Sequence, residues 1–225
     1  MREAVILAGG FGSRLKSVSG DTPKPMVDVA GVPFLYRLMK KLERDGFSKI
    51  ILSLGYRAEY VQARVEFSKP VDCEVLYSIE SEPLGTGGAI KKAASLIEGQ
   101  KFVVLNGDSY SEIDYADFFE RGSNVDLLIS GNEVLDVSRY GTLDLAEDGE
   151  VLKLVEKGRV GPGIINSGVY LVNKEDIEAK VEDVFSFEQD YVQDYTGRFY
   201  SYQTDGYFID IGIPEDYYAA CEYFL

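Results

Sequence analysis

The sequence predicts a single mixed α/β domain over residues 1–225, with a mainly parallel sheet. Three observations support this fold class. In the first half, apolar strand-like runs alternate with amphipathic helical stretches, as in a parallel sheet covered on both faces. After Asp126 the apolar runs are closely spaced and separated by turn residues, which favours antiparallel strands. No segment resembles a linker, an internal repeat or a low-complexity tract.

The first half contains four expected strands and three expected helices. The strands are buried apolar runs at residues 3–8, 49–54, 73–79 and 102–105. The helices are expected at residues 34–42, 58–67 and about 85–97. Pro33 at the first turn and Gly46 beyond the last apolar residue bound the first of these helices. Residues 9–25 are expected to form a loop, followed by a short extended piece at 26–29.

The second half is expected to begin with closely spaced antiparallel strands. They lie in the stretches 125–134, 142–156 and 163–172, with turns at Asp148-Gly149, inside the second stretch, and at Gly158. Helical segments near residues 173–180 and 186–195 follow, and then strands at 199–204 and 207–211. Pro214 marks the start of a last helix.

Charge narrows the choice of ligands. The chain has 38 acidic and 23 basic residues, a formal charge of −15. Residues 1–64 nevertheless hold 11 Lys and Arg against 6 Asp and Glu, a net of +5, and the remainder holds 12 against 32, a net of −20. This pattern offers no long cationic track for a nucleic acid. It suits a small anionic ligand in the first third and a divalent metal at carboxylates elsewhere.

Composition also excludes several kinds of site. The chain has no His, which removes Ser-His and Cys-His catalysis and His-zinc sites. Cys73 and Cys221 lack metal or redox spacing, so we expect buried free thiols. No apolar run approaches the roughly 18 residues of a membrane span, and Gly9 interrupts the first run too early for a signal peptide. We therefore expect a cytoplasmic protein with no membrane partner.

The loop after the first strand matches neither common phosphate motif. Leu15 stands where the dinucleotide fingerprint needs its third glycine, which disfavours a nicotinamide dehydrogenase. Leu15 also precedes Lys16-Ser17, where a P-loop needs glycine.

General chemistry still predicts an anion site in this loop. The backbone at Gly9, Gly10 and Gly12 can approach a ligand closely because no Cβ intervenes. Arg14 can form two hydrogen bonds to phosphate oxygens. Lys24 lies between two prolines, which restrict where its ammonium can go. The alternative is a surface loop with solvated cations, but the combination favours phosphate binding.

Two aspartates are candidate metal ligands. Asn106-Gly107-Asp108 follows a buried strand, at the end where ligands collect in parallel sheets. Asp210 lies inside an apolar strand, where an unpaired carboxylate is costly. Two such oxygen ligands, completed by phosphate oxygens and water, suit Mg²⁺. The alternative is that Asp108 caps a turn and Asp210 caps the last helix.

A second glycine loop opens a helix at residues 82–89, "EPLGTGGA". Gly85, Gly87 and Gly88 there offer an anion site or a slot for a flat base. Thr86 suits an ordinary helix N-cap, which is compatible with that role.

The later strands carry polar groups that suit a sugar phosphate. Glu156 and Asn166-Ser167 can bind sugar hydroxyls, and Lys157 can bind a phosphate. The alternative for Glu156-Lys157 is a surface ion pair.

Several motifs, in order along nearly the whole chain, resemble the sugar-1-phosphate nucleotidylyltransferases. They are "AVILAGGFGSRL…DTPKPMVDVAGVPFL", "EPLGTGGA", "VLNGD", "VEK", "NSGVYL" and "FIDIGIPEDY". The stretches "YSIESEPLGTGGAIKKA" and "SFEQD" are most similar to D-glycero-α-D-manno-heptose 1-phosphate guanylyltransferases, with mannose-1-phosphate guanylyltransferases close behind. The resemblance implies a Rossmann-like sheet with an antiparallel sugar-binding portion, the nucleotide-diphospho-sugar transferase fold. Many relatives have Asn where this chain has Ser109, so Ser109 has no implied role.

The resemblance also implies residue roles. The catalytic cations would be Arg14, at the leaving pyrophosphate, and Lys24, near the α-phosphate. The nucleotide site would comprise Leu7, Ala8, Gly9, Gly10, Gly12, Ser13, Arg14, Lys24, Pro83, Gly85, Gly88, Asn106, Gly107 and Asp108. The sugar phosphate would meet Gly141, Glu156, Lys157, Asn166 and Ser167. Asp108 and Asp210 would hold Mg²⁺.

The implied reaction joins an NTP and a sugar 1-phosphate, both small-molecule substrates, into an NDP-sugar and pyrophosphate. GTP and the heptose 1-phosphate are the expected pair, which would supply GDP-heptose for lipopolysaccharide, capsule or S-layer glycans. The alternatives are mannose 1-phosphate or another NTP, or a non-catalytic nucleotide-sugar-binding subunit. A homo-oligomer is possible through the Tyr-rich last helix.

Overall fold

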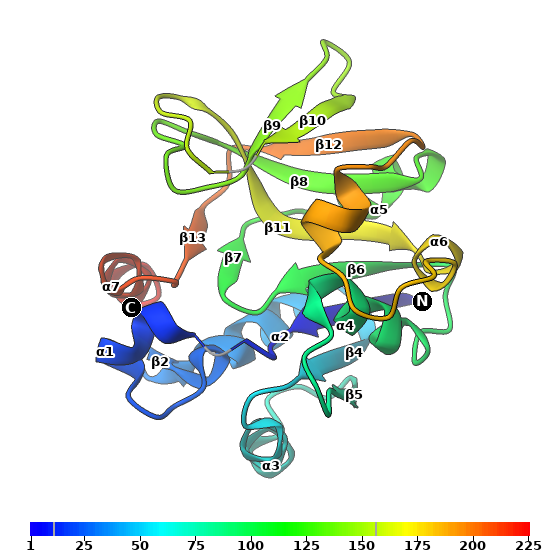
Figure 1. The fold of residues 1–225 in the computed structure, drawn as a ribbon. Helices are drawn as coiled ribbons and strands as arrows, with labels where there is room; N and C mark the ends of the chain where they lie inside the picture. The colour runs from blue at the N-terminus through cyan, green and yellow to red at the C-terminus, as the bar shows by residue number, and fades with distance from the viewer. Residues whose placement is uncertain (11, 156) are drawn as a thin grey trace.

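The computed structural model describes residues 1–10, 12–155 and 157–225. Its centre is a mixed sheet of nine strands among these residues, in the order β10-β9-β11-β6-β1-β4-β5, with β8 beside β11 and β12 beside β8 (Figure 1). The sheet strands are β1 (Arg2–Leu7), β4 (Phe47–Leu54), β5 (Glu74–Ile79), β6 (Lys101–Asn106), β8 (Leu127–Val134), β9 (Thr142–Leu145), β10 (Val151–Val155), β11 (Gly163–Asn173) and β12 (Phe199–Thr204). Two short ribbons pair β2 (Asp28–Val29) with β3 (Val32–Pro33) and β7 (Ser109–Ser111) with β13 (Phe208–Asp210).

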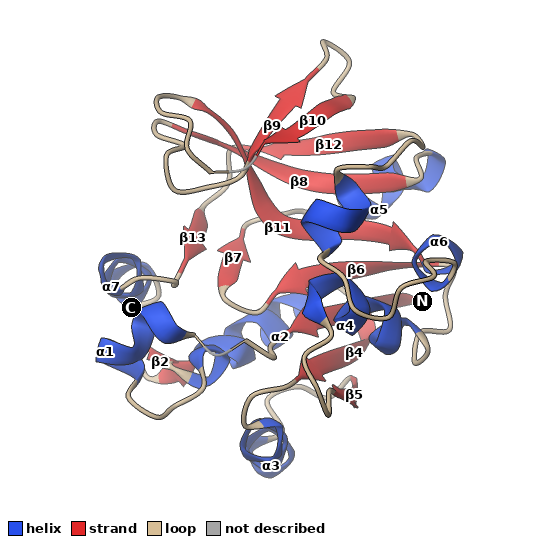
Figure 2. Cartoon of the chain, in the orientation of Figure 1, coloured by secondary structure: helices blue, strands red, loops and turns tan. Residues whose placement is uncertain are grey.

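The α-helices lie around this sheet (Figure 2). They are α1 (Lys16–Ser19), α2 (Phe34–Arg44), α3 (Ala58–Ser68), α4 (Gly85–Ala94), α5 (Tyr115–Arg121), α6 (Lys174–Glu178) and α7 (Pro214–Tyr223). A π-helix, η4, spans Glu188–Val192. No described helix has both the length and the apolar character needed to cross a membrane.

The parallel part of the sheet confirms the prediction for the first half. Strand β1 lies between β4 and β6, and β4 pairs with β5, all in parallel. Alternate residues of β1 enter two cores: Ala4 and Ile6 join the apolar face of α2, whereas Val5 joins Ile90 of α4. Burial on both faces explains why these strands are continuous apolar runs.

The second half is antiparallel with one exception. β11 pairs antiparallel with β6, β8 and β9, and β9 with β10, as expected. β12, in contrast, pairs parallel with β8 at the edge of the sheet. The fold class is therefore the predicted mixed α/β arrangement.

Some local predictions need correction. The expected loop at 9–25 contains helical turns at Ser13–Leu15 and Lys16–Ser19, and a third turn spans Lys24–Met26. Helix α5 and strand β7 were not predicted. Asp114 caps α5 by accepting hydrogen bonds from two backbone N–H groups, a signal that is present in the sequence. The free thiols, Cys73 and Cys221, are only partly buried.

Candidate active site

A cleft of about 820 Å³ opens at the carboxyl ends of the four parallel strands. Its lining includes residues that directly follow or end each strand: Ala8 after β1, Ser53 in β4, Glu80 after β5 and Asn106 in β6. The sheet order places Glu80 at one end of the cleft and β11 at the other. This is the edge at which parallel α/β sheets bind ligands.

Most of the predicted nucleotide-binding residues line this cleft. They are Leu7, Ala8, Gly9, Gly10, Gly12, Arg14, Lys24, Pro83, Gly85, Asn106, Gly107 and Asp108. The side chain of Ser13 lies outside the described part of the chain. Gly88 is buried in α4, where an added Cβ would lie 2.1 Å from the carbonyl oxygen of Asp183. Its position therefore reflects helix packing, and it does not line the cleft.

Glycine allows the first loop to pack closely. A Cβ at Gly12, whose φ is +60°, would lie 2.7 Å from Cβ of Lys24. A Cβ at Gly9 would lie 3.0 Å from the backbone nitrogen of Gly55. Gly10 has open space around it, which leaves its backbone accessible from the cleft.

Lys24 is a buried cation between two carboxylates. Its Nζ lies 2.6 Å from Oδ2 of Asp108 and 3.6 Å from Oδ1 of Asp210, and the residue is only 9% exposed. The ribbon of β7 and β13 brings the aspartates together, because Asp210 pairs with Ser109, the residue after Asp108. The sequence identified all three groups but could not show that they meet.

The environment of Asp210 disfavours its charged form. Burial raises the pKa of this carboxyl, and the negative charge of Asp108 raises it further. Lys24 and a hydrogen bond from the backbone N–H of Gly212 act in the opposite direction. Two neighbouring carboxylates, one of which is partly disfavoured in its charged form, are suited to bind a divalent cation. The positive charge of such a cation would lower the pKa of Asp210.

The two carboxylates do not form a complete metal cage. Among the described residues, no group of three or more acidic or thiol side chains is placed to hold a metal ion. The chemistry of Asp108 and Asp210 fits Mg²⁺, which commonly uses one or two protein carboxylates and completes its shell with phosphate oxygens and water.

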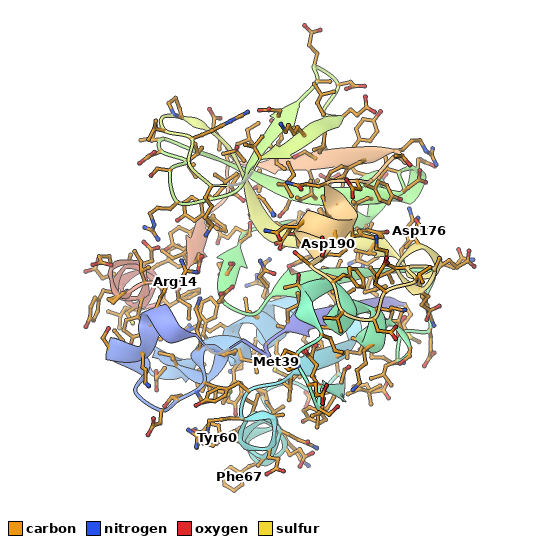
Figure 3. All side chains as sticks on the ribbon, viewed as in Figure 1. Arg14, Met39, Tyr60, Phe67, Asp176 and Asp190 are labelled. Atoms are coloured by element: carbon orange, nitrogen blue, oxygen red, sulfur yellow. The ribbon has the colours of Figure 1, made fainter. Side chains whose placement is uncertain are left out.

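Arg14 is an exposed cation at the mouth of the cleft. It belongs to the helical turn that follows the glycine loop and lines the cleft together with Lys24. Figure 3 shows Arg14 on the side of the molecule where α1, α7 and β13 approach one another. Its guanidinium is available to a ligand that enters from solvent.

The predicted sugar contacts are more scattered. Asn166 lies in β11, and its backbone N–H donates to the carbonyl of Gly141 at 2.9 Å. Lys157 is exposed between β10 and β11, and Glu156 lies outside the described residues. The hydroxyl of Ser167 is 1% exposed and donates to the carbonyl of Ser130. The side chain of Ser167 therefore does not face the cleft, contrary to its predicted role.

The cleft residues that were not predicted include Ser53, Glu80 and Glu188. Glu80 and Ser53 line the end near β5 and β4, and Glu188 lines the cleft from the π-helix η4. The rule that selected Asp108, a polar residue at the end of a buried strand, also applies to Glu80. Glu188 lies in the stretch "SFEQD", which contributed to the family resemblance, but the resemblance implied no role for this residue.

Ser53 has an unusual environment for a buried hydroxyl. It is 1% exposed, and within the described part of the chain its Oγ has no hydrogen-bond partner. Because buried hydroxyls are normally paired, this one marks a polar point on the cleft wall that a ligand could satisfy.

Comparisons with known proteins agree with this geometry. The family described as "Nucleotidyl transferase" matches residues 3–225. A D-glycero-alpha-D-manno-heptose 1-phosphate guanylyltransferase from Aneurinibacillus thermoaerophilus is 40% identical over 223 residues, which cover 97% of this chain and 96% of that protein. The crystal structure of HddC from Yersinia pseudotuberculosis has a TM-score of 0.95 and 57% identity, with full coverage of both chains. The same protein complexed with GMP-PN has a TM-score of 0.94 and 58% identity, again over both whole chains. This chain therefore belongs to the nucleotidyl transferase family.

Proposed function

We propose that the protein transfers GMP from GTP to D-glycero-α-D-manno-heptose 1-phosphate. The main support is the pair of Lys24 and Asp108 in a cleft that also contains a glycine loop and Arg14, with Asp210 beside Lys24. This combination can bind two polyanions and reduce their repulsion. The names of the relatives, which are heptose 1-phosphate guanylyltransferases, support this choice of substrates.

The proposed reaction is an in-line displacement at phosphorus. An oxygen of the sugar phosphate forms a bond to the α-phosphorus of GTP, and the bond from that phosphorus to the α–β bridging oxygen breaks. The products are GDP-heptose and pyrophosphate. The nucleophile is already an anion at neutral pH, so the reaction requires charge neutralisation and alignment rather than a general base.

The side chains of the cleft suit these two tasks. The ammonium of Lys24 has three N–H donors, so it can bind Asp108 and a phosphate oxygen at the same time. Arg14 can neutralise the leaving pyrophosphate from the solvent side. Asp108 and Asp210 would hold Mg²⁺, which when bound offsets phosphate charge.

Glu80 supports GTP as the nucleotide. It accepts a hydrogen bond from the backbone N–H of Leu84 at 3.0 Å, which orients its carboxylate at the β5 end of the cleft. Guanine presents two neighbouring donors, N1–H and the N2 amino group, whereas adenine presents an acceptor at N1. A carboxylate is only an acceptor and therefore favours guanine.

The biological setting is proposed on the same basis. We place the enzyme in the cytoplasm, where it would supply GDP-heptose for lipopolysaccharide, capsule or S-layer glycans, alone or as a homo-oligomer. Mannose 1-phosphate is the alternative acceptor, because mannose-1-phosphate guanylyltransferases are also similar to this chain at 30–31% identity.

A substrate panel tests the proposal. Pyrophosphate release should be measured with each of the four NTPs and with heptose, mannose and glucose 1-phosphates in the presence of Mg²⁺. We expect the highest kcat/KM with GTP and the heptose 1-phosphate, and no turnover in excess EDTA until Mg²⁺ is restored. Higher kcat/KM with mannose 1-phosphate would favour the alternative substrate. No pyrophosphate release with any substrate pair would favour a non-catalytic binding subunit. Full activity in EDTA would contradict the proposed requirement for Mg²⁺.

A further inference from the structure

Tyr170 is a buried tyrosine whose hydroxyl connects two polar side chains. The residue is 1% exposed, and its ring packs edge-to-face on Phe187 with centroids 4.9 Å apart. Its hydroxyl accepts a hydrogen bond from Nδ2 of Asn166 at 2.8 Å and donates one to Oε1 of Glu188 at 2.9 Å. Burial raises the pKa of Tyr170 well above that of a free tyrosine, so the hydroxyl keeps the proton that it donates.

The backbone holds the Asn166 end of this network in place. The pairing of β11 with β8 is irregular between Asn166 and Tyr170, and Gly168 there has a φ of +77°. The N–H of Gly168 donates to Oδ1 of Asn166 at 2.9 Å. A Cβ at Gly168 would lie 2.5 Å from Nδ2 of Asn106, so this bulge packs directly on a residue that lines the cleft. Bulges of this kind re-aim side chains near functional sites.

The other end of the network lies at the cleft. Glu188 lines the cleft and is the first residue of the π-helix η4, a rare element that is frequent at functional sites. Glu188 contacts Tyr170 of β11, whereas the glycine loop follows β1 and Glu80 follows β5. Because β11 lies on the far side of β6 and β1 from β5, Glu188 is remote from the end that we attribute to the base. Its carboxylate is suited to accept hydrogen bonds from sugar hydroxyls.

We propose that Tyr170 is a positioning residue that fixes the carboxylate of Glu188 for the sugar half of the cleft. This inference rests on the proposed function. Tyr170 does not touch the substrate; it limits the conformations of Glu188, so that the sugar phosphate binds without the entropic cost of ordering that side chain. Loss of the hydroxyl should therefore weaken sugar binding and leave nucleotide binding unchanged.

The test compares Tyr170→Phe with Tyr115→Phe. Tyr115 is equally buried, at 1% exposure, but lies in α5 within the other core and does not line the cleft. We expect Tyr170→Phe to raise KM for the sugar 1-phosphate about tenfold, the scale of one hydrogen bond to a charged group. KM for GTP should stay within about twofold of the wild type, and Tyr115→Phe should leave both KM values unchanged. A wild-type KM for the sugar in Tyr170→Phe, or an equal rise in both KM values, would overturn the proposal.

A double-mutant cycle separates positioning from general structural damage. If Tyr170 acts through Glu188, then the double variant Tyr170→Phe/Glu188→Gln should have the same KM for the sugar as Glu188→Gln alone. Multiplicative effects would show that Tyr170 acts independently of Glu188 and would overturn the inference. The cycle also separates positioning from a loss of stability in Tyr170→Phe. A loss of stability alone would raise KM for both substrates, whereas a lost positioning contact would raise only KM for the sugar 1-phosphate.

The failure of the proposed function is distinguishable from the failure of this inference. If the wild type releases no pyrophosphate with any substrate pair, then the function fails, and a crystal structure of Tyr170→Phe decides the inference. The Glu188 carboxylate should then leave its wild-type position. An unchanged Glu188 would show that the hydroxyl does not position it.

Discussion

At the scale of single residues, the proposed reaction would depend on a few cations that offset phosphate charge. Lys24 is held by two carboxylates in a nearly buried position, whereas Arg14 is exposed at the cleft mouth. The buried cation is preorganised, and the exposed one can move toward its ligand. We therefore expect Lys24 to contribute to alignment and Arg14 to neutralise the charge of the leaving group.

Removal of either cation should lower turnover. We expect Lys24→Ala and Arg14→Ala to reduce kcat by roughly 10²-fold, the usual effect of losing one group that stabilises charge in the transition state. Lys16→Ala is the matched control, since Lys16 is an exposed cation of the same segment that does not line the cleft. Steady-state pyrophosphate release gives kcat for each variant. Wild-type turnover in Lys24→Ala or Arg14→Ala would contradict that residue's role.

Base recognition is a second prediction at this scale. Glu80→Gln replaces one acceptor oxygen with an N–H₂ donor, so the ratio of kcat/KM for GTP over ATP should fall about tenfold or more. Glu82→Gln, a similar change two residues along the same segment, should have a smaller effect on the ratio. A larger effect at Glu82 would show that Glu82, and not Glu80, recognises the base.

At the scale of elements, glycines determine how α4 packs against the chain that precedes η4. An added Cβ would lie 2.1 Å from the ring of Phe185 at Gly87 and 2.1 Å from the carbonyl oxygen of Asp183 at Gly88. Both values are far below van der Waals contact, so the helix can approach residues 183–185 only because these side chains are absent. Two of the glycines that suggested a ligand site in the sequence thus serve to pack the helix.

Gly88→Ala should consequently destabilise the fold. We expect a loss of about 1–3 kcal/mol in the free energy of unfolding, the usual cost of inserting a methyl group into a packed site. Gly10→Ala serves as the control for stability, because a Cβ at Gly10 would meet open space and its φ is not in the left-handed region. Thermal or denaturant unfolding measures both variants. Equal stability of the two would contradict the packing role of Gly88.

The elements also show what the sequence could and could not predict. Continuous apolar runs located β1 and β4, and helical patterns located α2 and α3, to within about two residues at each end, because burial imposes a pattern on each of them. Pro214 marked the start of α7. Helix α5 has only seven residues and too short a stripe to show a period. The parallel pairing of β12 with β8 was not predictable, since the partner of an edge strand depends on tertiary contacts.

At the scale of the whole molecule, the order of the strands in the sheet brings residues from distant parts of the sequence together in one cleft. Glu80, the glycine loop, Asp108 and Glu188 are far apart in the sequence, but they follow or contact strands in the spatial order β5, β1, β6 and β11. The sequence pointed to the glycine loop, Arg14 and Lys24 of this cleft because glycines and cations have distinct chemistry. It did not predict Glu188, since a carboxylate in an acidic chain is unremarkable until the fold places it in the cleft.

The amino ends of the parallel strands, at the edge of the sheet opposite the cleft, contain a cluster of ion pairs. Lys49, near the start of β4, is 3% exposed and forms ion pairs with Glu3, Glu74 and Glu98. Glu3 also accepts hydrogen bonds from the backbone N–H groups of Glu98 and Gly99. These contacts join the amino ends of two central strands to the turn before β6. They should affect stability and leave catalysis unchanged.

The pH dependence of stability tests this separation. The hydrogen bond from Lys49 lowers the pKa of Glu98 below its usual value of 4.5. A depressed folded-state pKa gives stability that is present above the unfolded-state pKa and is lost as the pH falls through the folded-state value. Glu98→Gln should therefore be less stable than the wild type at pH 7, and the difference should be smaller at pH 3, which lies below the usual pKa of 4.5. Glu147→Gln, at an exposed carboxylate in the turn between β9 and β10, should match the wild type at both pH values. Denaturant unfolding at the two pH values, with KM for both substrates at pH 7, gives the answer. A stability difference as large at pH 3 as at pH 7 would mean that Glu98 acts through packing, and a changed KM would mean that the two ends of the sheet are coupled.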